Sequence, residues 1–331
     1  MKSNTGIGTI ATAERADRPF TLNRGRPYRG RFAPSPTGPL HFGSLVAAVA
    51  SYLAARQAGG EWLIRIEDVD RTREAPGSAE AIVRTLAELG FEWTGSILRQ
   101  SEQTERYEAV LARLVDGGFT YPCSCSRKTI AAASQPAAGE EPRYPGWCRR
   151  GVLDPSLPYA LRLKVEPGTV AFDDEIQGVV AIDVAADCGD FVVKRRDGLF
   201  AYQLAVVADD AAQGITHVVR GADLLTSTPR QLLLQRALGY AQPRYAHVPL
   251  ATDAQGVKFS KSAGAGAIDA TKPAGEIWRA LHFLRQSPPP QLRSADLATL
   301  WRWSIEHWST APLQGLRQSV AIVASSTEGP G

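Results

Sequence analysis

The sequence lacks the features that mark membrane-spanning and exported proteins. None of its 331 residues falls in an apolar run of the roughly 18 residues that a membrane-spanning helix needs. Residues 1–26 carry scattered charges and lack the apolar core of about 7–15 residues that a signal peptide contains. We therefore expect a disordered extension over residues 1–26 and a cytoplasmic protein without membrane contact.

Cysteine is scarce as well, and its placement is uneven. The chain has four cysteines, at positions 123, 125, 148 and 188. Without a secretory signal this argues against a disulfide framework and favours a bound metal or plain burial. Cys123, Cys125 and Cys148 supply three soft ligands, whereas a structural zinc site has four, and no histidine lies between them. We expect Cys188, outside this cluster, to be a buried strand residue.

The composition bounds the class of protein without identifying a partner. Hydrophobic residues make up 44% and charged residues 21%, as in ordinary globular proteins, and the length suits one large domain or two ordinary ones. The formal net charge of +3 permits a nucleic-acid partner but does not argue for one. Internal repeats and a coiled-coil pattern are both absent from the sequence, so we expect a monomer.

Strand and helix patterns alternate along much of the chain. We expect strands at 28–33, 61–66, 217–220 and 245–250, and helices at 41–58, 76–89, 103–115, 202–213, 224–238, 274–285 and 294–307. Such alternation predicts an α/β fold with a parallel, doubly wound sheet, in which ligands bind beyond the carboxyl ends of the strands. Segments 159–165, 176–184 and 191–195 alternate with period two and predict a mostly β insertion.

These elements predict a division of the chain. We expect two halves of one catalytic domain at 27–120 and 200–262, with the insertion at 121–199 between them. A helical C-terminal region at 263–318 and a disordered tail at 319–331 complete the chain.

Residues 30–44 read G-R-F-A-P-S-P-T-G-P-L-H-F-G-S and join the first strand to the first helix. His41 and Gly43 lie where that helix begins, and unpaired N–H groups at a helix start suit phosphate. The alternative is a tight strand–helix turn with a capping histidine.

A second stretch, K-F-S-K-S at 258–262, would by itself be a solvated basic loop. Together with H-F-G-S at 41–44 it resembles the two signature motifs of class I aminoacyl-tRNA synthetases. The resemblance implies a Rossmann-like catalytic domain that uses ATP with Mg²⁺. It also implies that His41 and Gly43 meet the phosphates and ribose of ATP, and that Lys261 reaches the phosphates from a mobile loop with Lys258 in support. Such cations stabilise the charge that develops on the phosphates.

Two further stretches resemble the glutamyl/glutaminyl branch of that class. These are R-F-A-P-S-P-T-G-P-L-H at 31–41 and R-I-E-D-V-D-R-T-R at 65–73, joined by Tyr202 and Arg220. The resemblance implies that Arg31 and Arg220 contact L-glutamate, Glu67 faces its ammonium and Tyr202 lines the pocket. It adds a pocket wall formed by Arg31, Phe32, Ala33, Pro34 and Ser35. The alternatives are a surface acid at Glu67 and a salt-bridged strand end at Arg220.

The same resemblance offers Tyr144 as the fourth ligand of one structural Zn²⁺ per chain, beside Cys123, Cys125 and Cys148. Glu140, Glu141 and a water molecule compete for that position. Buried or reactive thiols without metal remain the alternative.

Several residues differ from the usual pattern of the glutamyl/glutaminyl branch, and these differences indicate a narrower family. Leu224 stands where a histidine is usual, Val69 where threonine is usual, and 69 residues follow Ser262, too few for the usual anticodon-binding region. With the cysteine cluster, these features resemble the glutamyl-Q tRNA(Asp) synthetase family. That resemblance implies activation of glutamate without tRNA and its transfer to queuosine, in the anticodon loop of tRNA(Asp). The alternatives are a truncated glutamyl-tRNA synthetase charging a tRNA 3′ end, a non-catalytic RNA- or nucleotide-binding relative, and a nucleotidyltransferase making another acyl-adenylate.

Overall fold

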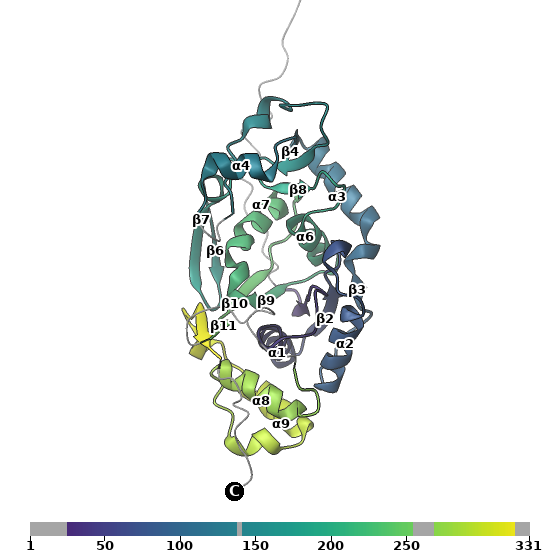
Figure 1. Cartoon of the computed structure of the whole chain (residues 1–331). Helices are drawn as coiled ribbons and strands as arrows, with labels where there is room; N and C mark the ends of the chain where they lie inside the picture. Colours follow the sequence, from purple (N-terminus) through teal and green to yellow (C-terminus); the bar gives the residue numbers. More distant parts are fainter. Residues whose placement is uncertain (1–24, 138–140, 254–267, 322–331) are drawn as a thin grey trace, which may run out of the picture.

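The computed structural model describes residues 25–137, 141–253 and 268–321. An α/β layer forms the middle of the molecule, the insertion lies at one end and the C-terminal helices lie at the other (Figure 1). Among these residues, no helix combines the length and the apolar character that crossing a bilayer would need.

Two adjoining, largely parallel sheets form the centre of the fold. In the first sheet, β2 pairs in parallel with β1 and β3. In the second, β10 pairs in parallel with β9 and β6, and β6 forms an antiparallel hairpin with β7. The N–H of Thr216 donates to the carbonyl of Arg29 at 2.9 Å, which brings β9 beside β1. The strands are β1 (Arg29–Phe32), β2 (Glu61–Ile66), β3 (Leu98–Arg99), β6 (Thr169–Asp174), β7 (Gly178–Asp183), β9 (His217–Gly221) and β10 (Arg244–Val248).

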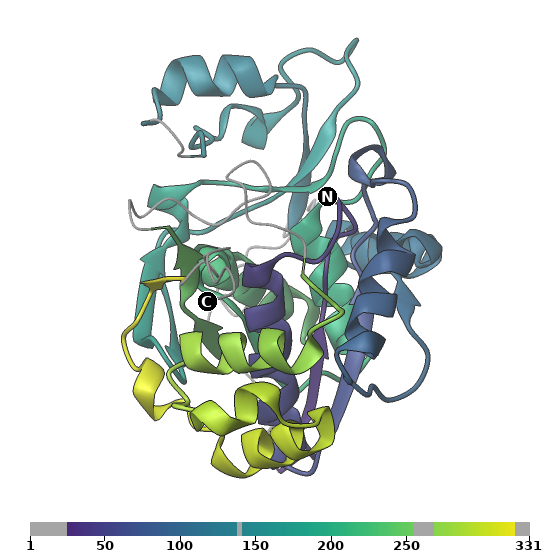
Figure 2. The ribbon, with the colours of Figure 1, turned by 60° about the horizontal axis from the view of Figure 1, so that its bottom comes forward.

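Helices cover both sides of these sheets. The largest hydrophobic cluster joins α1 to β1, β2 and the C-terminal helices α8 and α9, and a second cluster joins α3, α6 and α7 to the β6–β7 hairpin. Figure 2 shows α8 and α9 alongside α1, which explains why this helix is apolar on nearly every face. The helices are α1 (Phe42–Gln57), α2 (Ser78–Glu88), α3 (Thr104–Asp116), α6 (Tyr202–Ala212), α7 (Thr228–Leu238), α8 (Pro273–Phe283) and α9 (Leu297–His307).

The insertion has its own small sheet and core. β5 pairs antiparallel with both β4 and β8, and the adjoining core contains Tyr121, Cys123, Ile130, Tyr144 and Cys148. Its elements are β4 (Thr120–Cys123), α4 (Arg127–Ser134), β5 (Ala160–Leu163), α5 (Val184–Asp187) and β8 (Val192–Lys194). The predicted α/β class, with a cysteine-containing insertion and C-terminal helices, is confirmed.

Two predicted elements are divided in the structure. The helix expected at 224–238 is a 3₁₀ segment, η4 (Ala222–Ser227), followed by α7, because Pro229 occupies the first turn of α7, where proline is tolerated. The strand expected at 245–250 is interrupted at Pro249, and Leu250–Thr252 forms the separate strand β11.

Two further predictions need correction, and one strand was missed. Cys188 is buried as expected, but it follows α5 instead of lying in a strand. The pairing strand β6 was not predicted at all. Ser319 and Val320, expected in the disordered tail, belong to β12 (Gln318–Val320), because this segment pairs in parallel with β11.

Candidate active site

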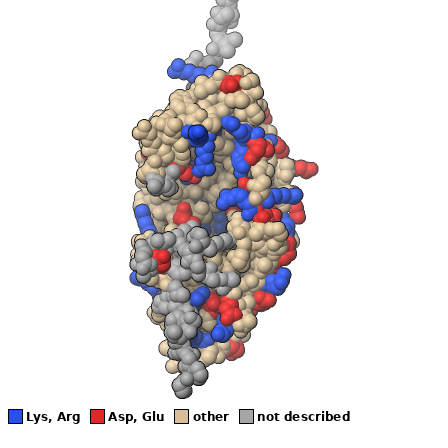
Figure 3. Space-filling view, in the orientation of Figure 1, with Lys and Arg blue, Asp and Glu red and all other residues tan. Residues whose placement is uncertain are grey.

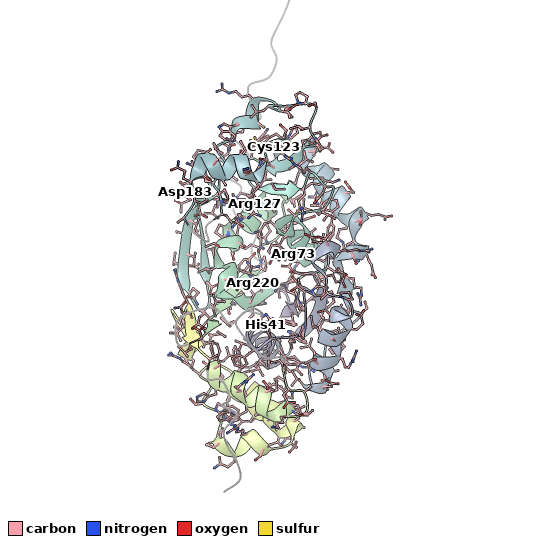
Figure 4. The ribbon with its side chains drawn as sticks, in the orientation of Figure 1. His41, Arg73, Cys123, Arg127, Asp183 and Arg220 are labelled. Carbon is pink, nitrogen blue, oxygen red and sulfur yellow. The ribbon has the colours of Figure 1, made fainter. Side chains whose placement is uncertain are left out.

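A cavity of about 1470 Å³ opens at the carboxyl ends of β1, β2 and β9 and extends toward the insertion. Figure 4 shows labelled side chains along it, from His41 through Arg220 to Arg127. The predicted residues that line it are Arg31, Phe32, Ala33, Pro34, Ser35, His41, Gly43, Glu67, Tyr202 and Arg220. Lys258 and Lys261 lie outside the described residues.

His41 caps the N-terminus of α1. Its backbone is extended, its Nδ1 accepts the N–H of Ser44 at 3.2 Å, and its Nε2 lies 3.0 Å from the Ser44 hydroxyl. Nδ1 must therefore be unprotonated, and Nε2–H can donate to the hydroxyl oxygen. The capping histidine considered as an alternative is thus present, and the same side chain lines the cavity beside Gly43.

A buried carboxylate fixes the orientation of Arg31. Asp210, on α6, accepts hydrogen bonds from Nε and Nη2 of Arg31 at 3.0 and 3.4 Å, and from Nη1 of Arg65 at 2.7 Å. Burial alone would raise the pKa of Asp210, but Arg31 and Arg65 hold it below its usual range, so it is ionised at pH 7. The guanidinium of Arg31 therefore meets the cavity in one fixed orientation.

Glu67 lies next to this network, at the end of β2. It accepts from Nη2 of Arg65 at 3.3 Å, and its side chain is only 7% exposed. Burial raises the pKa of Glu67, against the opposing effect of Arg65 and Arg31. Burial also raises the pKa of Tyr202, to which the charge of Glu67 contributes. The pocket thus combines a buried acid with a phenol that stays neutral.

A buried relay holds Arg220. Its Nε donates to Nε2 of His247 at 3.0 Å, and its Nη2 donates to the hydroxyl of Thr228 at 2.7 Å. His247 in turn donates from Nδ1 to Asp174 at 2.5 Å. Burial lowers the pKa of His247 to about 4, despite Asp174, so the imidazole is neutral at pH 7 and can accept from the arginine.

One donor of Arg220 has no partner among the described residues. Its Nη1 is buried and unsatisfied, although the residue lines the cavity. An unpaired buried N–H of a charged group costs more than about 1–3 kcal/mol, so such a group is normally paired in the working protein. A carboxylate entering the cavity would supply the missing acceptor.

The three clustered cysteines have a geometry that suits a metal ion. The sulfur atoms of Cys123, Cys125 and Cys148 all lie within 4.8 Å of one another, and those of Cys125 and Cys148 are 3.6 Å apart. Tetrahedral zinc with Zn–S bonds of about 2.3 Å places its sulfurs about 3.8 Å apart. The cysteine set therefore fits three corners of such a site.

Tyr144 lies against the cysteine cluster. Its hydroxyl oxygen lies 3.3 Å from the sulfur of Cys123 and 3.9 Å from that of Cys125, and it accepts the N–H of Cys148 at 2.9 Å. The guanidinium of Arg162 stacks 3.9 Å from the ring centroid of Tyr144. Of the competitors, Glu141 pairs with Arg230 at 2.7 Å, and Glu140 lies outside the described residues.

Comparison with known proteins identifies the relatives of this chain. The family described as "tRNA synthetases class I (E and Q), catalytic domain" matches residues 28–276. The glutamyl-Q tRNA(Asp) synthetase of Dechloromonas aromatica is 55% identical over 293 residues, which cover 88% of this chain and 97% of that protein. The protein of the same name from Geobacter sulfurreducens is 54% identical, covering 84% and 91%. The chain belongs to the glutamyl-Q tRNA(Asp) synthetase family.

A solved structure places this family member within the wider class. The glutamate-tRNA synthetase of Elizabethkingia anophelis superimposes with a TM-score of 0.74 at 25% identity, covering 88% of this chain and 68% of that one. The two chains therefore share the catalytic fold, whereas sequence identity is about twice as high to the glutamyl-Q tRNA(Asp) synthetases. The family predicted from the motifs is confirmed.

Several residues that hold the site of this synthetase were not predicted. Their side chains form hydrogen bonds with the predicted arginines or with one another. They are Arg65, Asp174, Asp210, Thr228 and His247. Only the adjacent pair Asp209–Asp210, near the C-terminal end of the largely apolar helix α6, offered a signal, because two acids in a buried helix require partners. Asp174 and His247 come together only through the pairing of β6 with β10.

Proposed function

We propose that this chain activates L-glutamate with ATP in the absence of tRNA, and then transfers the glutamyl group to queuosine at the first anticodon position of tRNA(Asp). The main support is sequence identity, which is 55% to a glutamyl-Q tRNA(Asp) synthetase over 97% of that protein, but 25% to a glutamate-tRNA synthetase. Such an enzyme would work in the cytoplasm, where tRNA is present, and we expect it to be a monomer.

In the first step a carboxylate oxygen of glutamate attacks the α-phosphorus of ATP, and pyrophosphate leaves. We assign the ATP phosphates and ribose to the start of α1, at His41 and Gly43, with Lys261 and Lys258 supplying cations. The N-terminal end of an α-helix such as α1 carries partial positive charge, which favours phosphate. Mg²⁺ bound with the nucleotide would neutralise part of the charge that develops on its phosphates.

Glutamate carries two carboxylates and an ammonium, and the cavity presents matching groups. Arg31 and Arg220 would each pair with a carboxylate, since a guanidinium binds carboxylate in a bidentate manner. Glu67 would face the ammonium, and Tyr202 would close the pocket. The fixed orientation of Arg31 and the unpaired Nη1 of Arg220 support these assignments.

In the second step a hydroxyl of the acceptor nucleoside attacks the carbonyl carbon of glutamyl-adenylate, its proton is lost, and AMP leaves. The acceptor must therefore reach the same cavity that holds the adenylate. Single-stranded loops with unstacked bases are the usual targets of sequence-specific RNA recognition, which suits an anticodon loop.

The decisive measurement has two stages. Glutamate-dependent exchange of pyrophosphate with ATP should proceed without any tRNA. Queuosine-containing tRNA(Asp) should then take up radioactive glutamate, and nuclease digestion should locate the label in the anticodon fragment. tRNA(Asp) carrying unmodified guanosine at that position serves as the control and should remain unlabelled. Exchange that depends on tRNA, or label on the 3′-terminal adenosine, would instead indicate a glutamyl-tRNA synthetase.

For the cysteine cluster we propose one structural zinc ion, held by Cys123, Cys125, Cys148 and Tyr144. The zinc would link β4, the segment before η3 (Trp147–Arg150) and η3 itself, which otherwise share only a small core. Tyr144 is suited to this role because its backbone N–H donates to the carbonyl of Cys188 at 3.0 Å and its hydroxyl accepts the N–H of Cys148 at 2.9 Å, which together hold the residue beside the cysteines.

Removing one ligand tests the metal site. Cys123→Ser should lower the zinc content of the purified protein from about one ion per chain to near zero, because a structural site needs its full ligand set. Cys188→Ser is the matched control and should keep its zinc. Inductively coupled plasma mass spectrometry measures both, and a metal-free wild type with an intact insertion would rule out the assignment.

A further inference from the structure

The outer part of the cavity carries cations that the activation step does not use. At about 1470 Å³ the cavity exceeds the ~300–1,000 Å³ typical of single small-ligand sites. Beyond the proposed glutamate pocket it is lined by Arg73, Arg127, Arg195, Arg196 and Arg230. Figure 3 shows Lys and Arg side chains gathered along the upper and right-hand edges of this hollow. We call these five side chains the rim arginines.

Three rim arginines are committed to protein partners. Arg195 pairs with Asp70 at 2.7 Å and with Asp197 at 2.5 Å. Arg196 donates to the carbonyls of Ser124 and Cys125 at 2.8 and 3.0 Å. The third, Arg230, pairs with Glu141 as described above. These contacts fix the shape of the rim and leave little of the charge of Arg195 and Arg230 uncompensated.

Arg73 and Arg127 differ from these three. Both are exposed, and neither side chain forms an ion pair or hydrogen bond with another described residue. Arg73 ends η1 (Arg71–Arg73), and Arg127 opens α4 of the insertion. Glu74 follows Arg73 on the same wall and weakens the positive potential there. Each of the two arginines offers one guanidinium group, so each is suited to a single anionic group.

Their position separates them from the start of α1. In Figure 4, His41 lies toward the C-terminal helices, Arg127 lies at the insertion end near Cys123, and Arg73 and Arg220 lie between them. A nucleoside that enters the cavity toward Arg220 would leave its neighbouring phosphates at this rim. Contacts to phosphate position a nucleic acid without reading its bases.

We propose that Arg73 and Arg127 bind phosphates of a single-stranded RNA loop next to the nucleoside that accepts glutamate. The assignment rests on the proposed function and adds residues for the second step alone. Because guanidinium groups bind phosphate through paired N–H donors, both residues act on RNA affinity and on its salt dependence, not on the chemistry of activation.

The test compares the two steps in the full-length protein. Arg73→Ala and Arg127→Ala should each raise the tRNA concentration needed for half-maximal transfer roughly tenfold, and the double variant should raise it further. With single-stranded RNA, losing two phosphate contacts should reduce the slope of log affinity against log salt by about 1.4. Glutamate-dependent pyrophosphate exchange, the KM for ATP and the zinc content should remain within twofold of wild type.

Arg302→Ala, an exposed arginine on α9 at the far end of the molecule, is the matched control and should leave both steps unchanged. An unaltered tRNA requirement in the double variant would overturn the assignment. A raised KM for ATP would also overturn it, because it would place these arginines on the nucleotide. Failure of the proposed function is distinct from both, since the wild type itself would then transfer no glutamate to the anticodon loop.

Discussion

Arg220→Lys should lower kcat/KM for glutamate in the activation step by roughly a hundredfold or more. A lysine offers a point charge on a flexible stem, so it cannot keep the contacts to His247 and Thr228 and also present two parallel donors. Truncating one partner of a buried, hydrogen-bonded charge pair costs about 2–5 kcal/mol, and each 1.4 kcal/mol is a factor of ten.

Steady-state pyrophosphate exchange at varied glutamate concentration measures this effect. The loss should appear mainly in KM for glutamate, with KM for ATP nearly unchanged, because the relay is directed at the amino acid. Arg302→Lys serves as the matched control on α9. If Arg220→Lys binds glutamate as well as the wild type does, the unpaired Nη1 is not a glutamate donor.

Asp210→Asn should lower the free energy of unfolding by about 3–5 kcal/mol, the range measured when one partner of a buried ion pair is removed. Arg31 and Arg65 are 4% and 0% exposed, and both rely on this carboxylate. An asparagine side chain has one acceptor oxygen and no charge, so Arg31 would lose its ion pair with this residue, and Arg65 would keep only Glu67 and Asp209 as charged partners.

Urea unfolding followed by tryptophan fluorescence measures this loss as a lower midpoint. Asp116→Asn, at the exposed end of α3, is the control. It should change the free energy of unfolding by less than about 0.5 kcal/mol. A midpoint for Asp210→Asn equal to that of the wild type would mean that water or a rearranged acid compensates both arginines.

The sequence predicted residues that line the cavity much better than the residues that hold those side chains in place. His41, Glu67 and Arg220 each follow or end a strand or begin a helix, so local patterns placed them at the carboxyl edge of the sheet. Asp174 lies 73 positions from His247, and their contact depends on the parallel pairing of β6 with β10. No local pattern encodes that pairing, and β6 itself was not predicted.

Boundaries failed where a single residue overrode a longer pattern. The apolar spacing from 224 to 238 continues through η4 into α7, but Pro229 can occupy only the first turn of an α-helix. Strand β12 has only three residues, so no alternating pattern marks it in the sequence, and its pairing with β11 defines it. The first error thus has its cause within the segment, whereas the second reflects a tertiary pairing that the segment does not contain.

The relay of Asp174, His247 and Arg220 also has a consequence for folding. Its members come from β6, β10 and β9, and Arg31 and Asp210, on the other side of the cavity, come from β1 and α6. Contacts between segments so distant in the sequence have high contact order and require loop closure before they form. An emerging chain would thus lack the support of Arg31 until α6 with Asp210 has been synthesised, and that of Arg220 until residue 247 has followed and β10 has paired. Glutamate that binds through these arginines would slow unfolding of the finished protein and have little influence on the rate at which it folds.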